Sequence, residues 1–169
     1  IFTLQPNGSG FSVLHVFDST DSSPAGGLLL GIDGALYGTT QFGAFGGGII
    51  FRLRQDGTGF TVLHSLADGG NPAADLIQGS DGALYGTTEY GGASNHGTVF
   101  KLQPDGTDFT VLHSFDGSDG AIPMAGLIQG GDGKLYGSTQ TGDTSRGGNI
   151  FTLQPNGSGF GVLHVFDST

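Results

Sequence analysis

The sequence of 169 residues contains no cysteine and no tryptophan, and only five of its residues are lysine or arginine. The lack of cysteine excludes a disulfide scaffold and a thiol enzyme. Fifteen aspartate and glutamate residues give a formal net charge of −10. Nucleic acids and anionic lipid surfaces favour basic proteins, so this charge argues against both as partners.

Long hydrophobic stretches are also lacking. No run approaches the roughly 20 apolar residues that a membrane-spanning helix needs, so membrane insertion is not expected. The first residue is Ile1, and neither an initiating methionine nor a signal peptide is recognisable. We therefore expect a processed product or a fragment of a longer protein.

Glycine, by contrast, is abundant, with 35 residues or roughly three times its average share. Both disordered chains and chains with many tight turns are rich in glycine. Apolar residues make up 36% of this chain and come in regular clusters, which a disordered chain lacks. The composition therefore favours short strands joined by tight turns.

Two motifs alternate along the chain. The first joins an Asp-Gly pair to Leu-Tyr-Gly and occupies residues 31–40, 79–88 and 131–140. The second contains Val-Leu-His and follows each of these copies, at residues 49–66, 98–115 and 149–166. A fourth copy of the second motif opens the chain, and segments 1–20 and 150–169 differ only at Ser12 and Gly161.

Each period of about 50 residues predicts four short strands. In the second period they are LIQGS (76–80), ALYGTT (83–88), TVFKLQ (98–103) and FTVLHSF (109–115). Asp-Gly or Asn-Gly pairs supply tight turns, because these residues tolerate positive φ. The fourth strand alternates, which places Phe109, Val111, His113 and Phe115 on one face. Both faces carry apolar groups, so a neighbouring sheet should cover each.

Four antiparallel strands per period, covered on both faces, are typical of a β-propeller blade. The predicted fold class is all-β, with about 3.5 blades in one continuous propeller-type domain. A half blade of third and fourth strands at 1–20 precedes complete blades at 21–66, 67–115 and 116–169. A linear β-solenoid is the alternative, although its coils are usually shorter.

The sequence LIQGSDGALYGTTEYGGASNHGTVFKLQPDGT (76–107) resembles the tandem repeat called GloVer. The resemblance covers essentially the whole chain, and the third copy, LYGSTQTGDTSRGGNIF (135–151), departs most from it. It implies a propeller-like bacterial protein that is extracellular or on the cell surface. It supplies no catalytic residues.

Three complete blades and a half cannot close a ring, because propellers need about four to eight blades. An open arc exposes strand edges and an uncovered blade face, so we expect a homo-oligomer, with a dimer favoured. Two copies could form a six-bladed ring in which the duplicated hairpins compete for one place. A seven-bladed ring and a longer parent array are the other interpretations.

Positions that every repeat fills with the same residue are interpreted as structural, because a catalytic group usually breaks repeat symmetry. These positions are Asp33, Asp81, Asp132, Tyr37, Tyr85, Tyr136, His15, His64, His113 and His164. The aspartates should make turns, and the histidines should donate to a neighbouring strand or loop. No catalytic residue, cofactor or metal site is predicted.

Two pairs of aspartates, Asp18 with Asp21 and Asp116 with Asp119, resemble fragments of a calcium-binding loop. Calcium requires six to eight oxygen ligands, and the full D-x-D-x-D-G pattern is absent from the sequence. Solvated acidic loops are the preferred interpretation.

The loops between second and third strands differ in chemistry between the copies. The candidate ligand-binding residues in these loops are Phe42, Tyr90, Asn95, His96 and Asp143. Aromatic rings beside polar groups can stack on a sugar and bind its hydroxyls, so a glycan is a candidate ligand. Drift in tolerant loops explains the same differences and is the preferred interpretation.

The main functional hypothesis is a non-enzymatic extracellular repeat module for structure or interaction. A lectin-like module that binds glycans through these loops is the first alternative. A propeller lyase or hydrolase is the second, although the sequence offers no acid–base set that breaks the repeat symmetry.

Overall fold

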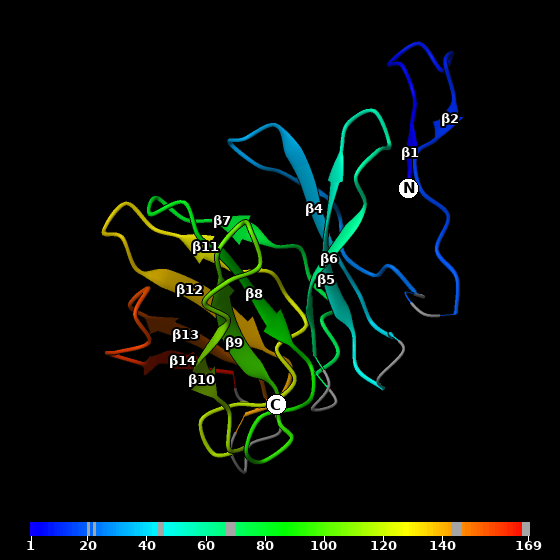
Figure 1. Ribbon diagram of the computed structural model, residues 1–169. Helices are drawn as coiled ribbons and strands as arrows, with labels where there is room; N and C mark the ends of the chain where they lie inside the picture. Colours follow the sequence, from blue (N-terminus) through cyan, green and yellow to red (C-terminus); the bar gives the residue numbers. More distant parts are fainter. Residues whose placement is uncertain (20, 22, 44–45, 67–69, 143–146, 167–169) are drawn as a thin grey trace.

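The computed structural model describes residues 1–19, 21, 23–43, 46–66, 70–142 and 147–166 (Figure 1). All regular elements among these residues are strands, and no helix among them is long and apolar enough to cross a membrane. The first two strands are β1 (Phe2–Thr3) and β2 (Ser12–Val13), which pair with each other. We call residues 1–17, which hold both strands, the N-terminal hairpin.

The other strands form three four-stranded sheets among the described residues, which we call blades 1, 2 and 3. Blade 1 contains β3 (Leu29–Leu30), β4 (Ala35–Thr40), β5 (Ile49–Arg54) and β6 (Thr61–Ser65). Blade 2 contains β7 (Ile77–Gln78), β8 (Leu84–Thr88), β9 (Thr98–Leu102) and β10 (Thr110–Ser114). Blade 3 contains β11 (Ile128–Gln129), β12 (Leu135–Thr139), β13 (Asn149–Leu153) and β14 (Gly161–Val165). In every blade the strands pair antiparallel in chain order, which confirms the predicted four-stranded blade.

The first strand of each blade is shorter than predicted. In blade 2 the amide of Gly79 donates to the carbonyl of Ala83 at 2.9 Å, so the turn already begins at Gly79. The ring of Tyr85 lies against this glycine, and a Cβ there would approach the ring to 2.7 Å. A larger residue would push the ring away, which explains the glycine before each Asp-Gly turn.

The predicted alternation of the fourth strand is wrong, because a β-bulge interrupts it. In β10 the register shifts between Val111 and His113, and β6 and β14 carry the same irregularity. Because of the extra residue, the side chains after the bulge point to the opposite face of the sheet from the one that the alternation predicts. Phe109 therefore stacks on His64 of blade 1, whereas His113 stacks on Phe160 of blade 3.

The hydrophobic core lies between the blades. We call the side of a blade toward the preceding sheet its front face, and the side toward the following sheet its back face. One buried cluster joins the back face of blade 1 to the front face of blade 2 and contains Ala35, Tyr37, Ile50, Leu76, Leu84, Phe100 and Leu102. The next joins blade 2 to blade 3 and contains Ala83, Tyr85, Val99, Phe115, Leu127, Leu135, Phe151 and Leu153. The N-terminal hairpin and blade 3 stand at opposite ends of this row (Figure 1).

Candidate functional site

A histidine at the end of the fourth strand links each sheet to the next. The ring of His113 stacks on Phe160 of blade 3 at a centroid distance of 3.6 Å and an interplanar angle of 5°. The ring of Phe115 packs edge-on against His113, at a centroid distance of 4.8 Å. Its Nε2 lies 2.8 Å from Oδ2 of Asp119, whose Oδ1 accepts the amide of Asp116. The histidine is thus held between two sheets.

The same arrangement recurs where the N-terminal hairpin meets blade 1. His15 stacks on Phe60 at 3.8 Å, and its Nε2 lies 3.0 Å from Oδ2 of Asp21. At the far end of the row, His164 contacts Phe166 edge-on at 4.7 Å. Within the described part of the chain, no aromatic ring stacks on His164. The last histidine therefore lacks the contact that the others make with the following sheet.

One aspartate of each acidic pair lies at hydrogen-bond distance from one of these histidines. Asp21 and Asp119 each face a histidine, as described above. Hydrogen bonds from the hydroxyl and amide of Ser118 lower the pKa of Asp116 to about 2. Among the described residues, no three or more histidine, aspartate or glutamate side chains gather in a way that could hold a metal ion. The geometry is that of an ordered turn.

The aspartate of each Asp-Gly turn binds the tyrosine four residues later. Oδ1 of Asp81 accepts the amide of Ala83, and Oδ2 accepts the hydroxyl of Tyr85 and the ammonium of Lys101, both at 2.8 Å. Burial alone would favour the neutral acid, but these bonds together hold the pKa of Asp81 below its ordinary value. Burial, and then the hydrogen bond to Asp81, raises the pKa of Tyr85.

Blades 1 and 3 repeat this pair. In blade 1, burial and the hydrogen bond to Asp33 raise the pKa of Tyr37 to about 12. In blade 3 the hydroxyl of Tyr136 donates to Asp132 at 2.8 Å. Each tyrosine stays protonated and each aspartate ionised at neutral pH, so neither is suited to proton transfer there.

The loops between second and third strands present two exposed rings in equivalent places. The hydroxyl of Thr40 donates to the carbonyl of Phe42, and that of Thr88 donates to the carbonyl of Tyr90. Phe42 is 48% exposed and Tyr90 41% exposed. The two residues belong to different blades, and no ring contact joins them within the described structure.

The other candidate ligand-binding residues are used differently. Asn95 has a φ of 57°, and its Oδ1 accepts the amide of Gly91, so the side chain shapes its own loop. The ring of His96 lies over Gly117, and its buried Nδ1 has no hydrogen-bond partner among the described residues. Asp143 lies outside the described residues. Among the described candidates, Phe42 and Tyr90 combine an exposed side chain with no side-chain hydrogen bond that shapes the loop.

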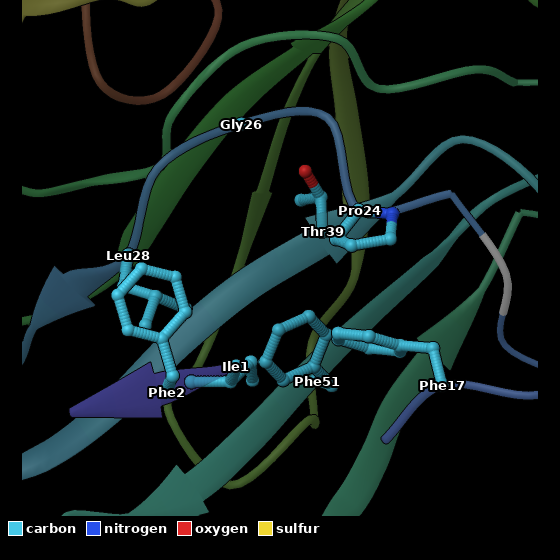
Figure 2. Close-up of a pocket in the computed structure, with 8 residues that line it drawn as sticks. All are labelled: Ile1, Phe2, Phe17, Pro24, Gly26, Leu28, Thr39 and Phe51. Atoms are coloured by element: carbon cyan, nitrogen blue, oxygen red, sulfur yellow. The ribbon is translucent and has the colours of Figure 1, made fainter. Parts of the chain in front are cut away.

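A cavity of about 390 Å³ lies between the N-terminal hairpin and the front face of blade 1. Figure 2 shows Ile1 and Phe2 of the hairpin beside Leu28 and Phe51 of blade 1. Its walls are Ile1, Phe2, Phe17, Pro24, Gly26, Leu28, Thr39 and Phe51. Sequence reasoning missed this cavity. One feature of the sequence could have indicated it. The first motif precedes every copy of the second motif except the opening one, so the opening copy lacks the strands of the first motif.

A second hollow, of about 260 Å³, lies on the back face of blade 3. It is lined by Gly126, Ile128, Tyr136, Gly137, Ser138 and Ile150. In blade 2 the residues equivalent to Ile128 and Tyr136 are Ile77 and Tyr85, which pack against blade 3. The hollow is therefore the same surface without a following sheet among the described residues.

The family model described as the Gloeobacter/Verrucomicrobia repeat matches residues 1–169. The chain belongs to this repeat family. The match agrees with the resemblance given by the sequence motifs. Among proteins with curated descriptions, none matches the chain significantly.

Solved structures similar to this member of the repeat family confirm a propeller-like fold. The putative TolB from Agrobacterium tumefaciens has a TM-score of 0.66 at 12% identity, over 98% of this chain and 56% of that one. A putative gluconolactonase has a TM-score of 0.57 at 22% identity, over 82% and 48%. A chain of a nidogen/laminin complex has 0.61 at 20% identity, over 84% and 48%. The chain spans about half the length of these structures.

Proposed function

We propose that this chain is a non-enzymatic, extracellular repeat module of bacteria, which serves structure or interaction and completes its ring by self-association. The observation that carries the proposal is the use of the repeated polar residues. His113 and Asp119 join two blades, and Asp81 and Tyr85 fix a turn within one blade. The repeated aspartates and tyrosines, and the repeated histidines except His164, thus hold each turn together or join one repeat to the next.

Self-association is supported by the two ends of the row. Leu28 and Phe2 are exposed at the N-terminal end, and Ile128 and Phe166 are exposed at the back face of blade 3. Each equivalent residue of an interior blade is buried or packed against a neighbouring sheet. Apolar faces of this kind associate in water, because association removes them from solvent.

The mass in solution tests this proposal. Sedimentation equilibrium of the 169-residue chain should give twice the chain mass of 17.1 kDa, with dissociation on dilution. A single-chain mass at every concentration would contradict self-association.

A lectin-like role is the second candidate, because Phe42 and Tyr90 are exposed at the same backbone position of two blades. A glycan array should then show binding that the double substitution Phe42→Ala and Tyr90→Ala abolishes. Ala substitution of Asn95, whose side chain shapes its own loop, would confuse loss of shape with loss of contact, so it is not a suitable probe. No binding to any glycan would remove this candidate.

A lyase or hydrolase is the third candidate. One similar structure is named a putative gluconolactonase, but at 22% identity the likeness concerns the fold alone. Turnover of lactone substrates by the purified chain would be needed to support this activity.

A further inference from the structure

The N-terminal hairpin has the sequence of the outer half of blade 3 but a different environment. Phe2 and Phe151 occupy the same repeat position, yet Phe2 is 63% exposed and Phe151 is fully buried. The strand β13 pairs with β12 on one side and β14 on the other, whereas β1 pairs only with β2 among the described residues. Side-chain contacts therefore hold the hairpin on blade 1 without a second-strand neighbour.

We propose that blade 3 of a second copy docks on the front face of blade 1 in the place of the N-terminal hairpin, so that two copies close a six-bladed ring. The inference rests on the self-association proposed above and names its surfaces. In the monomer, the hairpin then occupies the position that the outer strands of the partner's blade 3 take in the dimer. Six blades lie within the range of closed propellers, about four to eight.

The chain already contains the required contact between blades twice. Tyr37 of a back face and Leu84 of the next front face belong to one buried cluster, and Tyr85 and Leu135 belong to the next cluster in the same way. The back face of blade 3 offers Tyr136 at this position. The front face of blade 1 has the corresponding Leu36. A second copy would therefore repeat a contact that the sequence already encodes.

The hairpin fills only part of the front face of blade 1. It supplies His15, which stacks on Phe60, and Phe17, which lies against Phe51 at 5.5 Å. It supplies no residue at the positions of Ile128 and Tyr136, and the cavity of about 390 Å³ lies beside it. A docked blade 3 would supply the hairpin contacts through its identical strands, and would add β11 and β12 to fill the cavity.

Leu30 of blade 1 differs in chemistry from the equivalent residues of blades 2 and 3. Gln78 and Gln129 hold the same repeat position and accept the amides of Ile32 and Ser80 from the preceding blade. Leu30 replaces this glutamine on blade 1 and is 58% exposed. At this position the front face of blade 1 is thus more apolar than the interior front faces, and a docked blade 3 would bury Leu30 there without the interblade hydrogen bond that glutamine accepts. An apolar surface at this point suits a face that is buried by association.

The hairpin is the segment expected to leave, because it is held less firmly than β13 and β14. In blade 3, β13 pairs with β12 over five residues, from Leu135 with Leu153 to Thr139 with Asn149, and β14 pairs with β13. They also contact blade 2 through Phe151 and Phe160. Release of the hairpin gives up its contacts with blade 1 and the contact of His15 with Asp21. The partner's blade 3 would restore the contacts with blade 1.

Matched substitutions in the two identical hairpins test the proposal. His164→Ala removes the partner's stack on Phe60 and should raise the dissociation constant of the dimer. The expected factor is roughly ten- to a hundred-fold, because each ring contains two such contacts. His15→Ala weakens the competing hairpin and should lower the dissociation constant by a similar factor. A His15→Ala variant that dimerises more weakly would overturn the proposal, because the hairpin would then belong to the dimer interface.

A disulfide test locates the interface independently. The chain has no native cysteine, so a disulfide in the variant with Leu30→Cys and Gly131→Cys must join the engineered positions. A Cβ at Gly131 meets no atom within 4 Å, so cysteine fits there. The positive control is Ser80→Cys with Gln129→Cys, which lies one interface earlier and within one chain.

Each outcome is decisive. A covalent dimer through positions 30 and 131 supports the proposed docking. A dimer by mass that lacks this disulfide overturns the docking site and leaves self-association standing. A monomer at all concentrations overturns both, and an extended polymer contradicts closure by two copies.

Discussion

Residues 1–17 and 150–166 are almost the same sequence in two environments. In blade 3 the sequence forms strands of five residues, β13 and β14, whereas in the N-terminal hairpin it forms strands of two residues, β1 and β2. The differing residue does not explain this, because a Cβ at Gly161 meets no atom within 4 Å. Strand length in this fold therefore depends on the neighbouring second strand more than on the local sequence.

The phenylalanine of the third strand shows how this dependence arises. The ring of Phe151 fits over Gly137 of β12, where a Cβ would approach the ring to 2.5 Å. Leu127, which directly precedes β11, also borders this site. Phe2 has neither neighbour among the described residues and contacts Phe11 of its own hairpin at 5.7 Å. The buried ring of Phe151 stabilises the long copy of the strand. The exposed ring of Phe2 does not stabilise the other copy in this way, and that strand is short.

Phe151→Ala and Phe2→Ala should show the largest difference between the two copies. Truncation of the buried ring is expected to lower the free energy of unfolding by about 3–5 kcal/mol. The exposed ring should contribute about 0.5 kcal/mol or less in the monomer. Urea unfolding at low protein concentration measures both, and equal losses would contradict the comparison.

Gly137→Ala tests whether the glycine is needed because of the ring. The added methyl group would clash with Phe151, so a loss of roughly 1–3 kcal/mol in unfolding free energy is expected. Gly161→Ser makes the two hairpins identical and serves as the control, with a change within about 0.5 kcal/mol. If both variants kept full stability, the fit between ring and glycine would not matter.

Tyr85→Phe and Tyr136→Phe compare an interior blade with the last one. Both substitutions remove the hydroxyl that binds the aspartate of the turn. The loss at the buried Tyr85 should be about 1 kcal/mol. At Tyr136, water can replace the missing donor, so thermal unfolding should move less. A larger effect at Tyr136 than at Tyr85 would count against this account.

The smallest expected effect is a dependence of stability on acid. The folded-state pKa of Asp81 lies below its ordinary value of 3.8, so its contribution is present above that pH. The contribution is lost as the pH falls through the folded-state pKa. Asp81→Asn should therefore flatten the decline in unfolding free energy between neutral and strongly acidic pH. Parallel declines in variant and parent would show that this carboxylate contributes nothing.

Much of the fold could be predicted from the sequence, because turns and periods are local signals. The Asp-Gly pairs and the period of the motifs indicated four strands per blade, and the sheets confirm it. The bulge in β10 could not be predicted, because FTVLHSF reads as one regular alternation. Only the contacts of Phe109 with His64 and of His113 with Phe160 reveal that the strand serves two neighbours.

Less of the candidate site could be predicted. The repetition of His113 indicated a structural role, but its partner Asp119 was read as part of a solvated loop, because proximity across a turn has no sequence signature. The exposure of Phe42 and Tyr90 agrees with a surface loop, although it does not establish a ligand. The cavity beside Phe2 depends on which strand is missing from a sheet, and that requires the assembled structure.

Hydrogen exchange at increasing protein concentration tests the central claim most directly. Peptides that include Ser12 or Gly161 can be told apart by mass, because the two hairpins differ at this position. As the dimer forms, amides in residues 1–17 should exchange faster, while those of residues 150–166 should exchange more slowly. Slower exchange in residues 1–17 would contradict the claim that the N-terminal hairpin yields its place to a second copy.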